Sequence, residues 1–122
     1  MSRLKRIFQN KSKQVLNVYC TAGYPTLEST ISVMKALQNN GADIIELGMP
    51  YSDPLADGAV IQASSSKALA NGMSIETLFN QLKDFRKEIT LPVVLMGYMN
   101  PVLQYGFEKF CEDAALVGID GL

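Results

Sequence analysis

Three carboxylates in the first half of the chain are set where acid–base chemistry is possible. Glu46 lies in an apolar run that predicts a buried strand over residues 43–47, and Asp53 and Asp57 follow in a loop rich in glycine and proline, residues 48–58. An acid on a buried strand and acids on the loop after it can lie close together at one end of a sheet. We therefore single out Glu46 and Asp57 as candidate catalytic residues.

The two carboxylates are expected to differ in environment and therefore in role. Glu46, placed at the end of its strand, would be partly desolvated, which suits a group that both donates and accepts protons. Asp57 would lie in a wetter place, remain charged and stabilise positive charge. Structural explanations stay open beside these roles. Glu46 could pair with a cation, Asp57 could be a turn residue or cap a helix that begins near Val60, and Asp53 precedes a proline as turn residues do.

Composition and charge exclude several classes of function. The chain has 122 residues, 48% hydrophobic and 19% charged, with a net charge of −1. That balance provides no electrostatic footprint for nucleic acid or an anionic membrane. No signal peptide is seen at the start, and no apolar run is long enough for a membrane span. Cys20 and Cys111 have neither metal-ligand nor disulfide spacing, so we expect no metal and free thiols in a reducing cytoplasm. Because the chain contains no histidine, proton transfer would fall mainly to Asp, Glu, Tyr, Lys or Cys.

Apolar periodicity predicts alternating strands and helices. The strands are continuous apolar runs, which is typical of a parallel sheet covered by helices. Thr26 and Ser74 are placed to cap two of the helices, and glycines or asparagines end them. Strands are predicted over residues 15–20, 43–47 and 92–96 and from residue 119; helices are predicted around 4–8, 26–39, 60–70, 74–85 and 102–117.

This order favours an α/β fold that is the N-terminal half of a (β/α)8 TIM barrel. No G-x-G-x-x-G follows the first strand, which argues against a dinucleotide fold. The loops after the first three strands carry the unusual residues, and a barrel builds its active site from such loops. Eight βα units need about 250 residues. We therefore expect residues 1–122 to form a partial barrel domain, with an N-terminal helix, three βα units and the start of strand four. It would be part of a longer chain, or it would complete its sheet with another chain.

One dense motif resembles a known family. The run Glu-Leu-Gly-Met-Pro-Tyr-Ser-Asp-Pro-Leu-Ala-Asp-Gly, residues 46–58, looks like the signature of the tryptophan synthase alpha chain family. Residues 19–25 and 96–101 resemble the family's first and third strand–loop segments. The resemblance covers essentially all of this chain but only the first half of a family member. It implies a (β/α)8 barrel that cleaves indole-3-glycerol phosphate to indole and glyceraldehyde 3-phosphate by a retro-aldol reaction, without a cofactor in this subunit.

The resemblance also implies roles for single residues. Glu46 matches the general acid/base, and Asp57 matches the group that stabilises the indolenine cation through the ring N–H. Tyr19 matches an indole-pocket position that is commonly Phe in the family. Further matched positions form two sets: the substrate surroundings Ile61, Met96 and Tyr98, and the surface facing a beta chain, represented by Pro50, Asp53, Asn100 and Pro101.

The implied partner is a tryptophan synthase beta chain in an α2β2 heterotetramer. That chain would hold pyridoxal phosphate and receive indole through a tunnel. The family's phosphate-binding loops and mobile closing loop have no counterpart in these 122 residues, so we expect little or no lyase activity from them alone. Two alternatives remain. The chain could be a non-catalytic half-barrel that docks on a beta chain, or another phosphate-binding barrel enzyme. Against the second, no lysine stands at the C-terminal end of a strand.

Overall fold

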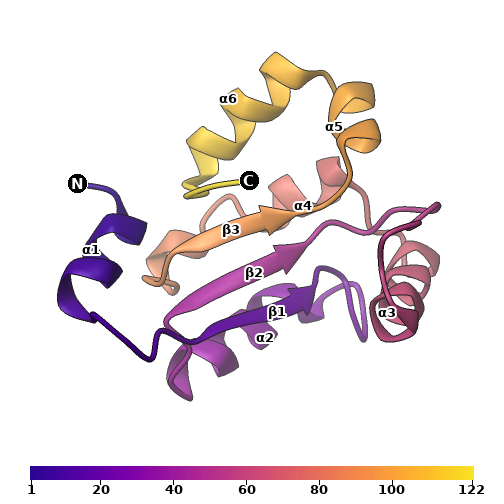
Figure 1. The fold of residues 1–122 in the computed structure, drawn as a ribbon. Helices are drawn as coiled ribbons and strands as arrows, with labels where there is room; N and C mark the ends of the chain where they lie inside the picture. The colour runs from indigo at the N-terminus through magenta and orange to yellow at the C-terminus, as the bar shows by residue number, and fades with distance from the viewer.

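The computed structural model describes residues 1–122 and contains one parallel sheet. Its strands are β1 (Asn17–Thr21), β2 (Ile44–Gly48) and β3 (Val93–Met96), in the order β1-β2-β3. Helices connect the strands, which is what allows consecutive strands to run parallel (Figure 1). The predicted alternation of strands and helices is confirmed. The remaining elements are α1 (Arg3–Asn10), α2 (Ser29–Asn39), α3 (Ala59–Ala70), α4 (Ile75–Gln81), a short 3-10 turn (Phe85–Lys87), α5 (Met99–Tyr105) and α6 (Phe107–Val117).

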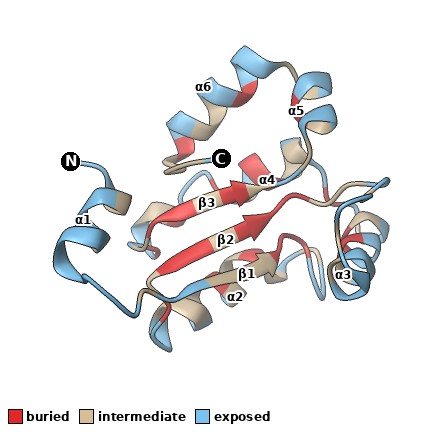
Figure 2. Ribbon diagram, in the orientation of Figure 1, coloured by how far each residue is buried: buried red, intermediate tan, exposed pale blue.

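The core lies between one face of the sheet and the helices behind it. In Figure 1, α2 and α4 lie behind the strands, whereas no helix crosses the face turned toward the viewer. Figure 2 shows that β2 and β3 are the most deeply buried strands, while β1 is mostly intermediate. Side chains alternate along a strand, so Ile45 and Leu47, both fully buried, point to the core and Glu46 points to the other face. The uncovered face is therefore the one that carries the candidate site.

A single bridge lies beside β3 where the start of a fourth strand is predicted. Gly121 forms an isolated parallel bridge with Val94, and its carbonyl accepts from the Leu95 N–H at 2.9 Å. Asp120 fastens this end of the chain, because its carboxylate accepts from the Val93 N–H and from two arginines. Arg86 Nη2 lies 2.6 Å from Oδ2, and Arg3 Nη1 lies 3.1 Å from Oδ1.

Two helix predictions are wrong in detail. Helix α2 begins at Ser29 and is not capped by Thr26, because the Thr26 carbonyl accepts from the Ser29 N–H in a separate turn. The Thr26 side chain bonds the Ser29 hydroxyl at 2.8 Å instead. The helix predicted over residues 102–117 is two helices, α5 and α6. Gly106 separates them with φ of 106°, a backbone conformation that favours glycine.

The other ends of the helices agree with prediction. Ser74 caps α4 by accepting from the Thr77 N–H at 3.1 Å, and Gly118 ends α6 in the left-handed conformation. The apolar stripe of α4 continues past its last residue, Gln81, so that Leu82 and Phe85 are buried although the helix has ended. None of the helices is both long and apolar enough to span a lipid bilayer.

Candidate active site

Glu46 is the central residue of β2, and its predicted place at the strand end is wrong. The strand continues to Gly48, which pairs with Thr21 on one side and Met96 on the other. Glu46 itself pairs with Tyr19 and is half-buried. Strand length is decided here by partners distant in sequence, which local patterning does not reveal.

The Glu46 carboxylate is held by an amide rather than by a cation. Asn17 Nδ2 donates to Glu46 Oε2 at 2.8 Å. Glu46 takes part in none of the ion pairs of the structure, so the explanation that a cation neutralises it is wrong. Asn17 lies two residues before Tyr19 on β1, on the same face of the sheet. This leaves Oε1 without a hydrogen-bond partner.

Asp57 lies at the end of the loop before α3 and does not cap that helix. The N-cap is Gly58, and no side chain caps the first turn. The backbone carbonyl of Asp57 accepts from Gln62 Nε2 at 2.7 Å, whereas its half-buried carboxylate faces a cavity. The structural explanation of Asp57 as a helix cap is therefore wrong.

A cavity of about 160 Å³ gathers most of the predicted site residues. Its wall includes Asp57, Tyr19, Met96 and Tyr98, which come from two strands and two loops. Glu46 and Ile61 are not part of the wall, although Glu46 is the strand neighbour of Tyr19. The other lining residues are Met49, Ala56, Ser65 and Gly97.

The Tyr19 ring lies over Gly48 and needs a glycine there. A Cβ built on Gly48 would stand 2.1 Å from Tyr19 Oη and 2.5 Å from Cζ, far inside contact distance. Burial raises the pKa of Tyr19, and the charges of Asp57, Cys20 and Glu46 add to that effect, while a hydrogen bond with Thr21 opposes it. The pKa of this phenol is therefore raised in part by both candidate carboxylates.

Tyr19 also begins a chain of hydroxyl groups that sequence reasoning missed. Tyr19 Oη lies 3.0 Å from Thr21 Oγ1, which lies 2.8 Å from Ser64 Oγ, and Ser64 donates to the Ile61 carbonyl at 3.0 Å. Ile61 therefore contributes its backbone to this edge of the site. The alternation of a strand puts Asn17, Tyr19 and Thr21 on one face, and that is the signal that would have found Asn17 and Thr21. Nothing local marks Ser64.

The loops after β2 and β3 are joined above the cavity. The Ala56 N–H donates to Tyr98 Oη at 3.0 Å, and Asn100 Nδ2 donates to Tyr51 Oη at 3.1 Å. The rings of Tyr51 and Tyr98 lie 5.2 Å apart, centroid to centroid. Asp53 is exposed, and its carboxylate accepts only from the hydroxyl of its neighbour Ser52, at 3.1 Å.

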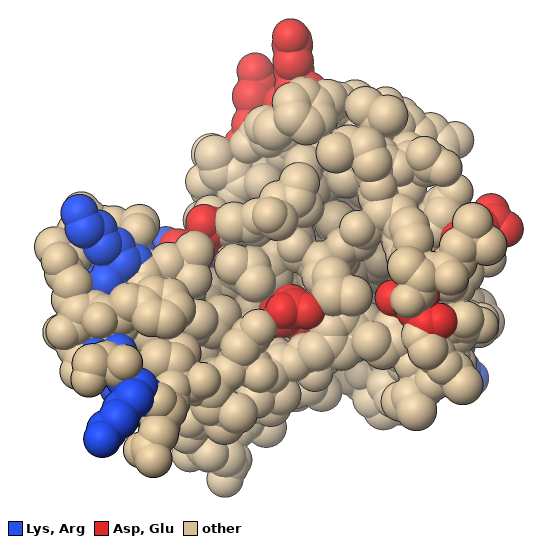
Figure 3. Space-filling view, viewed as in Figure 1, with Lys and Arg blue, Asp and Glu red and all other residues tan.

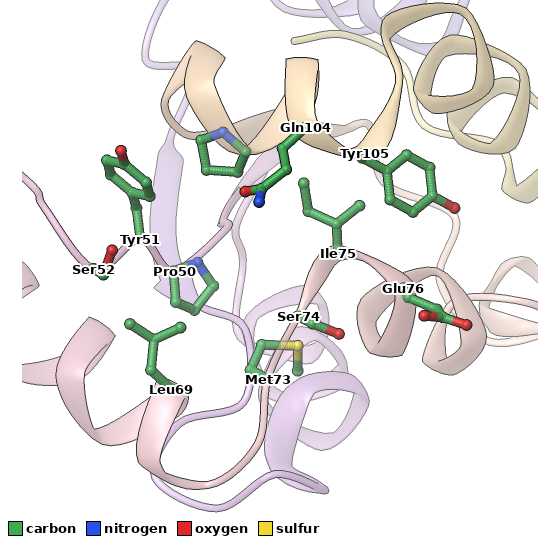
Figure 4. A pocket seen from close by; sticks show the side chains of 11 residues that line it. Pro50, Tyr51, Ser52, Leu69, Met73, Ser74, Ile75, Glu76, Gln104 and Tyr105 are labelled. Carbon is green, nitrogen blue, oxygen red and sulfur yellow. The ribbon is translucent and has the colours of Figure 1, made fainter.

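A wider hollow of about 390 Å³ lies between the two loops and the helices beside them. Figure 4 shows Pro50, Tyr51 and Ser52 on one side and Gln104 and Tyr105 on the other. Of the four residues predicted to face a partner, Pro50 and Pro101 line this hollow, and Asp53 and Asn100 do not. Neither Glu46 nor Asp57 lines it, so this hollow is distinct from the candidate site.

The remaining reactive groups do not add to the site. No cluster of acidic or cysteine side chains is arranged to hold a metal ion. Burial raises the pKa of Cys20 to about 11, which keeps its thiol protonated and unreactive near neutral pH. Figure 3 shows the open face as largely uncharged, with basic groups gathered over α1 and separate acidic spots elsewhere.

Comparisons with known proteins agree along the whole chain. The family profile described as "Tryptophan synthase alpha chain" matches residues 5–122. Proteins of that name from Phocaeicola vulgatus and Parabacteroides distasonis are 52% and 51% identical over 122 residues. The match covers 100% of this chain but 47% and 48% of theirs. The chain thus spans about half the length of the curated relatives it matches.

Solved structures give the same result. Tryptophan synthase subunit alpha from Legionella pneumophila str. Paris superposes with a TM-score of 0.93 at 42% identity, covering 99% of this chain and 48% of the other. Tryptophan synthase from M. tuberculosis, in an aminoacrylate-bound form, gives a TM-score of 0.88 at 34% identity and covers 98% and 49%. The parallel sheet and its helices therefore correspond to about half of these proteins.

Proposed function

Because the chain belongs to the tryptophan synthase alpha chain family, we propose that it carries the proton-transfer part of a lyase active site. The reaction is the cleavage of indole-3-glycerol phosphate to indole and glyceraldehyde 3-phosphate in tryptophan biosynthesis. The observation that carries this proposal is the 160 Å³ cavity, where Asp57, Tyr19, Met96 and Tyr98 meet beside Glu46. The family match sets aside the alternative of a different phosphate-binding barrel enzyme.

In this proposal Glu46 moves the protons. Its carboxylic acid form gives a proton to the indole ring carbon that carries the glycerol chain, which leaves a cationic indolenine. The resulting carboxylate then takes the proton of the adjacent glycerol hydroxyl. The carbon–carbon bond breaks, its electrons restore the indole ring, and the oxygen becomes the aldehyde carbonyl. Asn17, by holding Oε2, fixes the direction in which the other oxygen reaches the substrate.

Asp57 stabilises the charge that this protonation creates. A carboxylate beside the ring N–H favours the cationic indolenine over the neutral indole, and such placed charges are a large part of catalysis. Met96, Met49 and the Tyr19 ring provide apolar surface for the indole. At about 160 Å³ the cavity is below the 300–1,000 Å³ or so usual for ligand sites, which fits a place for the ring rather than for the whole substrate.

We infer the wider setting from the same family membership. Residues 1–122 form one partial-barrel domain, and the chain supplies no cofactor. Its partner is a beta chain that carries pyridoxal phosphate, with an α2β2 assembly and a cytoplasmic location; nucleic acid and membranes are not partners. The surface that meets the beta chain includes Pro50, Asp53, Asn100 and Pro101.

A docking role without catalysis is the second candidate. The observation that favours it is the hollow of about 390 Å³ bordered by Pro50 and Pro101, which could receive a partner side chain whether or not the chain is catalytic. The uncovered sheet face around Glu46 also admits water, which weakens the electrostatic effects on which catalysis depends.

One substitution separates the two candidates. Glu46→Gln keeps the shape and the Asn17 contact but removes proton transfer. For a catalytic chain we expect the variant to lose indole formation and keep its affinity for a purified beta chain. A docking module would be unchanged in both. The measurement is indole release from indole-3-glycerol phosphate together with a binding titration.

The rate of the unmodified chain is a prediction in itself. We expect the purified 122-residue chain, with its mass confirmed, to release indole far more slowly than a full-length relative. Turnover comparable to that of the Legionella protein would show that the uncovered face does not slow indole release. That result would overturn this part of the proposal.

A further inference from the structure

The loop between β2 and α3 carries Asp57 but has few ties of its own. Within residues 50–57 the backbone–backbone bonds are short-range: Leu55 N–H to the Asp53 carbonyl at 2.9 Å and Asp57 N–H to the Pro54 carbonyl at 3.3 Å. Leu55 is 95% exposed, so the loop is not anchored by burial of its apolar residue. The position of Asp57 must therefore depend on contacts from outside the loop.

Two such contacts are present: Gln62 of α3 donates through Nε2 to the Asp57 carbonyl at 2.7 Å, and Tyr98 supplies the contact from the β3 side. Its hydroxyl accepts from the N–H of Ala56, the residue directly before Asp57, at 3.0 Å. Tyr98, Ala56 and Asp57 all line the 160 Å³ cavity. Among the backbone groups of residues 50–57, the Ala56 N–H is the only one bonded to a residue of the β3 side of the site.

The Tyr98 ring is itself held in place. It packs on Tyr51 with an interplanar angle of 32°, and the Tyr51 hydroxyl accepts from Asn100 Nδ2 at 3.1 Å. Tyr98 immediately precedes α5 and serves as its N-cap residue, so its backbone is also fixed. A rigid aromatic side chain, held at both ends, can keep a loop within about 0.5 Å of one position.

We propose that Tyr98 is a positioning residue for Asp57, acting through the Ala56 amide. The proposal rests on the role of Asp57 in the proposed function. It differs from the role that the family resemblance implies for Tyr98, contact with the substrate, because the hydroxyl oxygen accepts from the loop. Loss of the hydroxyl would free the loop and leave the ring in the cavity.

Tyr19 reports the position of Asp57 independently of any reaction. The charge of Asp57 contributes to the raised pKa of Tyr19, after the larger effect of burial, and Cys20 and Glu46 contribute as well. If Asp57 moves away or becomes disordered, the Tyr19 pKa falls toward its ordinary value. A purely structural role of Tyr98, confined to loop packing at the surface, would leave this pKa where it is.

The test compares Tyr98→Phe with Tyr24→Phe, which removes the same atom from an exposed ring that makes no hydrogen bond. In Tyr98→Phe we expect the Ala56 amide to exchange with solvent about three to ten times faster, as loss of one neutral hydrogen bond implies. The Tyr19 phenol, followed by NMR of labelled tyrosine, should titrate at lower pH. Tyr24→Phe should change neither.

A double variant makes the test specific to Asp57. Asp57→Asn alone should lower the Tyr19 pKa, and adding Tyr98→Phe to it should give no further decrease. Unchanged amide exchange at Ala56, or a Tyr19 titration unaffected by Tyr98→Phe, would overturn the positioning role. Neither measurement requires catalysis, so a failure of the proposed reaction, seen as indole release that survives Glu46→Gln, is a separate result.

Discussion

Gly48→Ala tests whether the close approach of Tyr19 to β2 shapes the site. Gly48 has ordinary strand pairing, so the backbone accepts alanine and the only obstacle is the ring above it. The nearest atom, Tyr19 Oη, would lie 2.1 Å from the new Cβ, whereas ordinary contact begins at 3.4 Å. The hydroxyl must therefore move by about 1.3 Å, the difference between those two distances. That displacement breaks the 3.0 Å bond to Thr21.

The energetic cost follows from these two losses. Forcing a side chain away from an inserted methyl group costs about 1–3 kcal/mol, and a neutral hydrogen bond contributes about 0.5–1.5 kcal/mol. We expect Gly48→Ala to lower the free energy of unfolding by about 2–4 kcal/mol. The assay is urea denaturation followed by far-UV circular dichroism, with Gly58→Ala as the control. A Cβ on Gly58 meets nothing within 4 Å, so that variant should lose less than about 1 kcal/mol, from its N-cap position alone.

A second background identifies the cause. In Tyr19→Ala the ring is absent, so adding Gly48→Ala should cost little there. An equal loss of stability in both backgrounds would refute the reasoning, because the cost would then come from the strand and not from the ring.

The remaining predictions concern ionisable groups outside the catalytic pair. Burial raises the pKa of Cys20 from 9.0 to about 11. The stability that the protonated thiol contributes is therefore complete below pH 9 and is lost as the pH rises toward 11. The loss amounts to about 2–3 kcal/mol of the free energy of unfolding. Urea midpoints between pH 8 and pH 11 should fall for the chain and fall less for Cys20→Ala, and a thiol reagent at pH 8 should modify the exposed Cys111 first. Asp120→Asn leaves the half-buried Arg86 without its anion, and breaking such a buried pair costs about 3–5 kcal/mol. The control is Asp84→Asn, which breaks an exposed ion pair whose side chains are 77% and 76% accessible. It should change the thermal midpoint by less than about 2 °C. Equal effects of Asp120→Asn and Asp84→Asn would contradict the assigned difference in burial.

Much of the fold was predictable because its signals are local. Continuous apolar runs marked the strands, and Ser74 and Gly118 marked helix ends through hydrogen bonds within a few residues. Where a prediction was wrong, the structure depended on a residue distant in sequence or on a single glycine. The end of β2 depends on pairing with Thr21 and Met96, and Gly106 interrupts an apolar pattern that otherwise continues.

The site shows the same division. The acids and the loop that carries Asp57 were evident from residue type and motif, and Tyr19, Met96 and Tyr98 do share one cavity with Asp57. The contacts that hold them were not evident. Asn17 and Glu46 are 29 positions apart, and Ala56 and Tyr98 are 42 apart. Such pairs exist only once the sheet has brought their strands together.

The attachment of α1 by Asp120 also joins two segments that are synthesised at different times. Helix α1 has no buried residue of its own, and Arg3 reaches its partner across 117 positions of sequence. At synthesis rates of about 5–20 residues per second, Arg3 exists for roughly 6–23 seconds before Asp120 is made. Helix α1 therefore cannot form its ion pair with Asp120 until the residues of all three strands have been made.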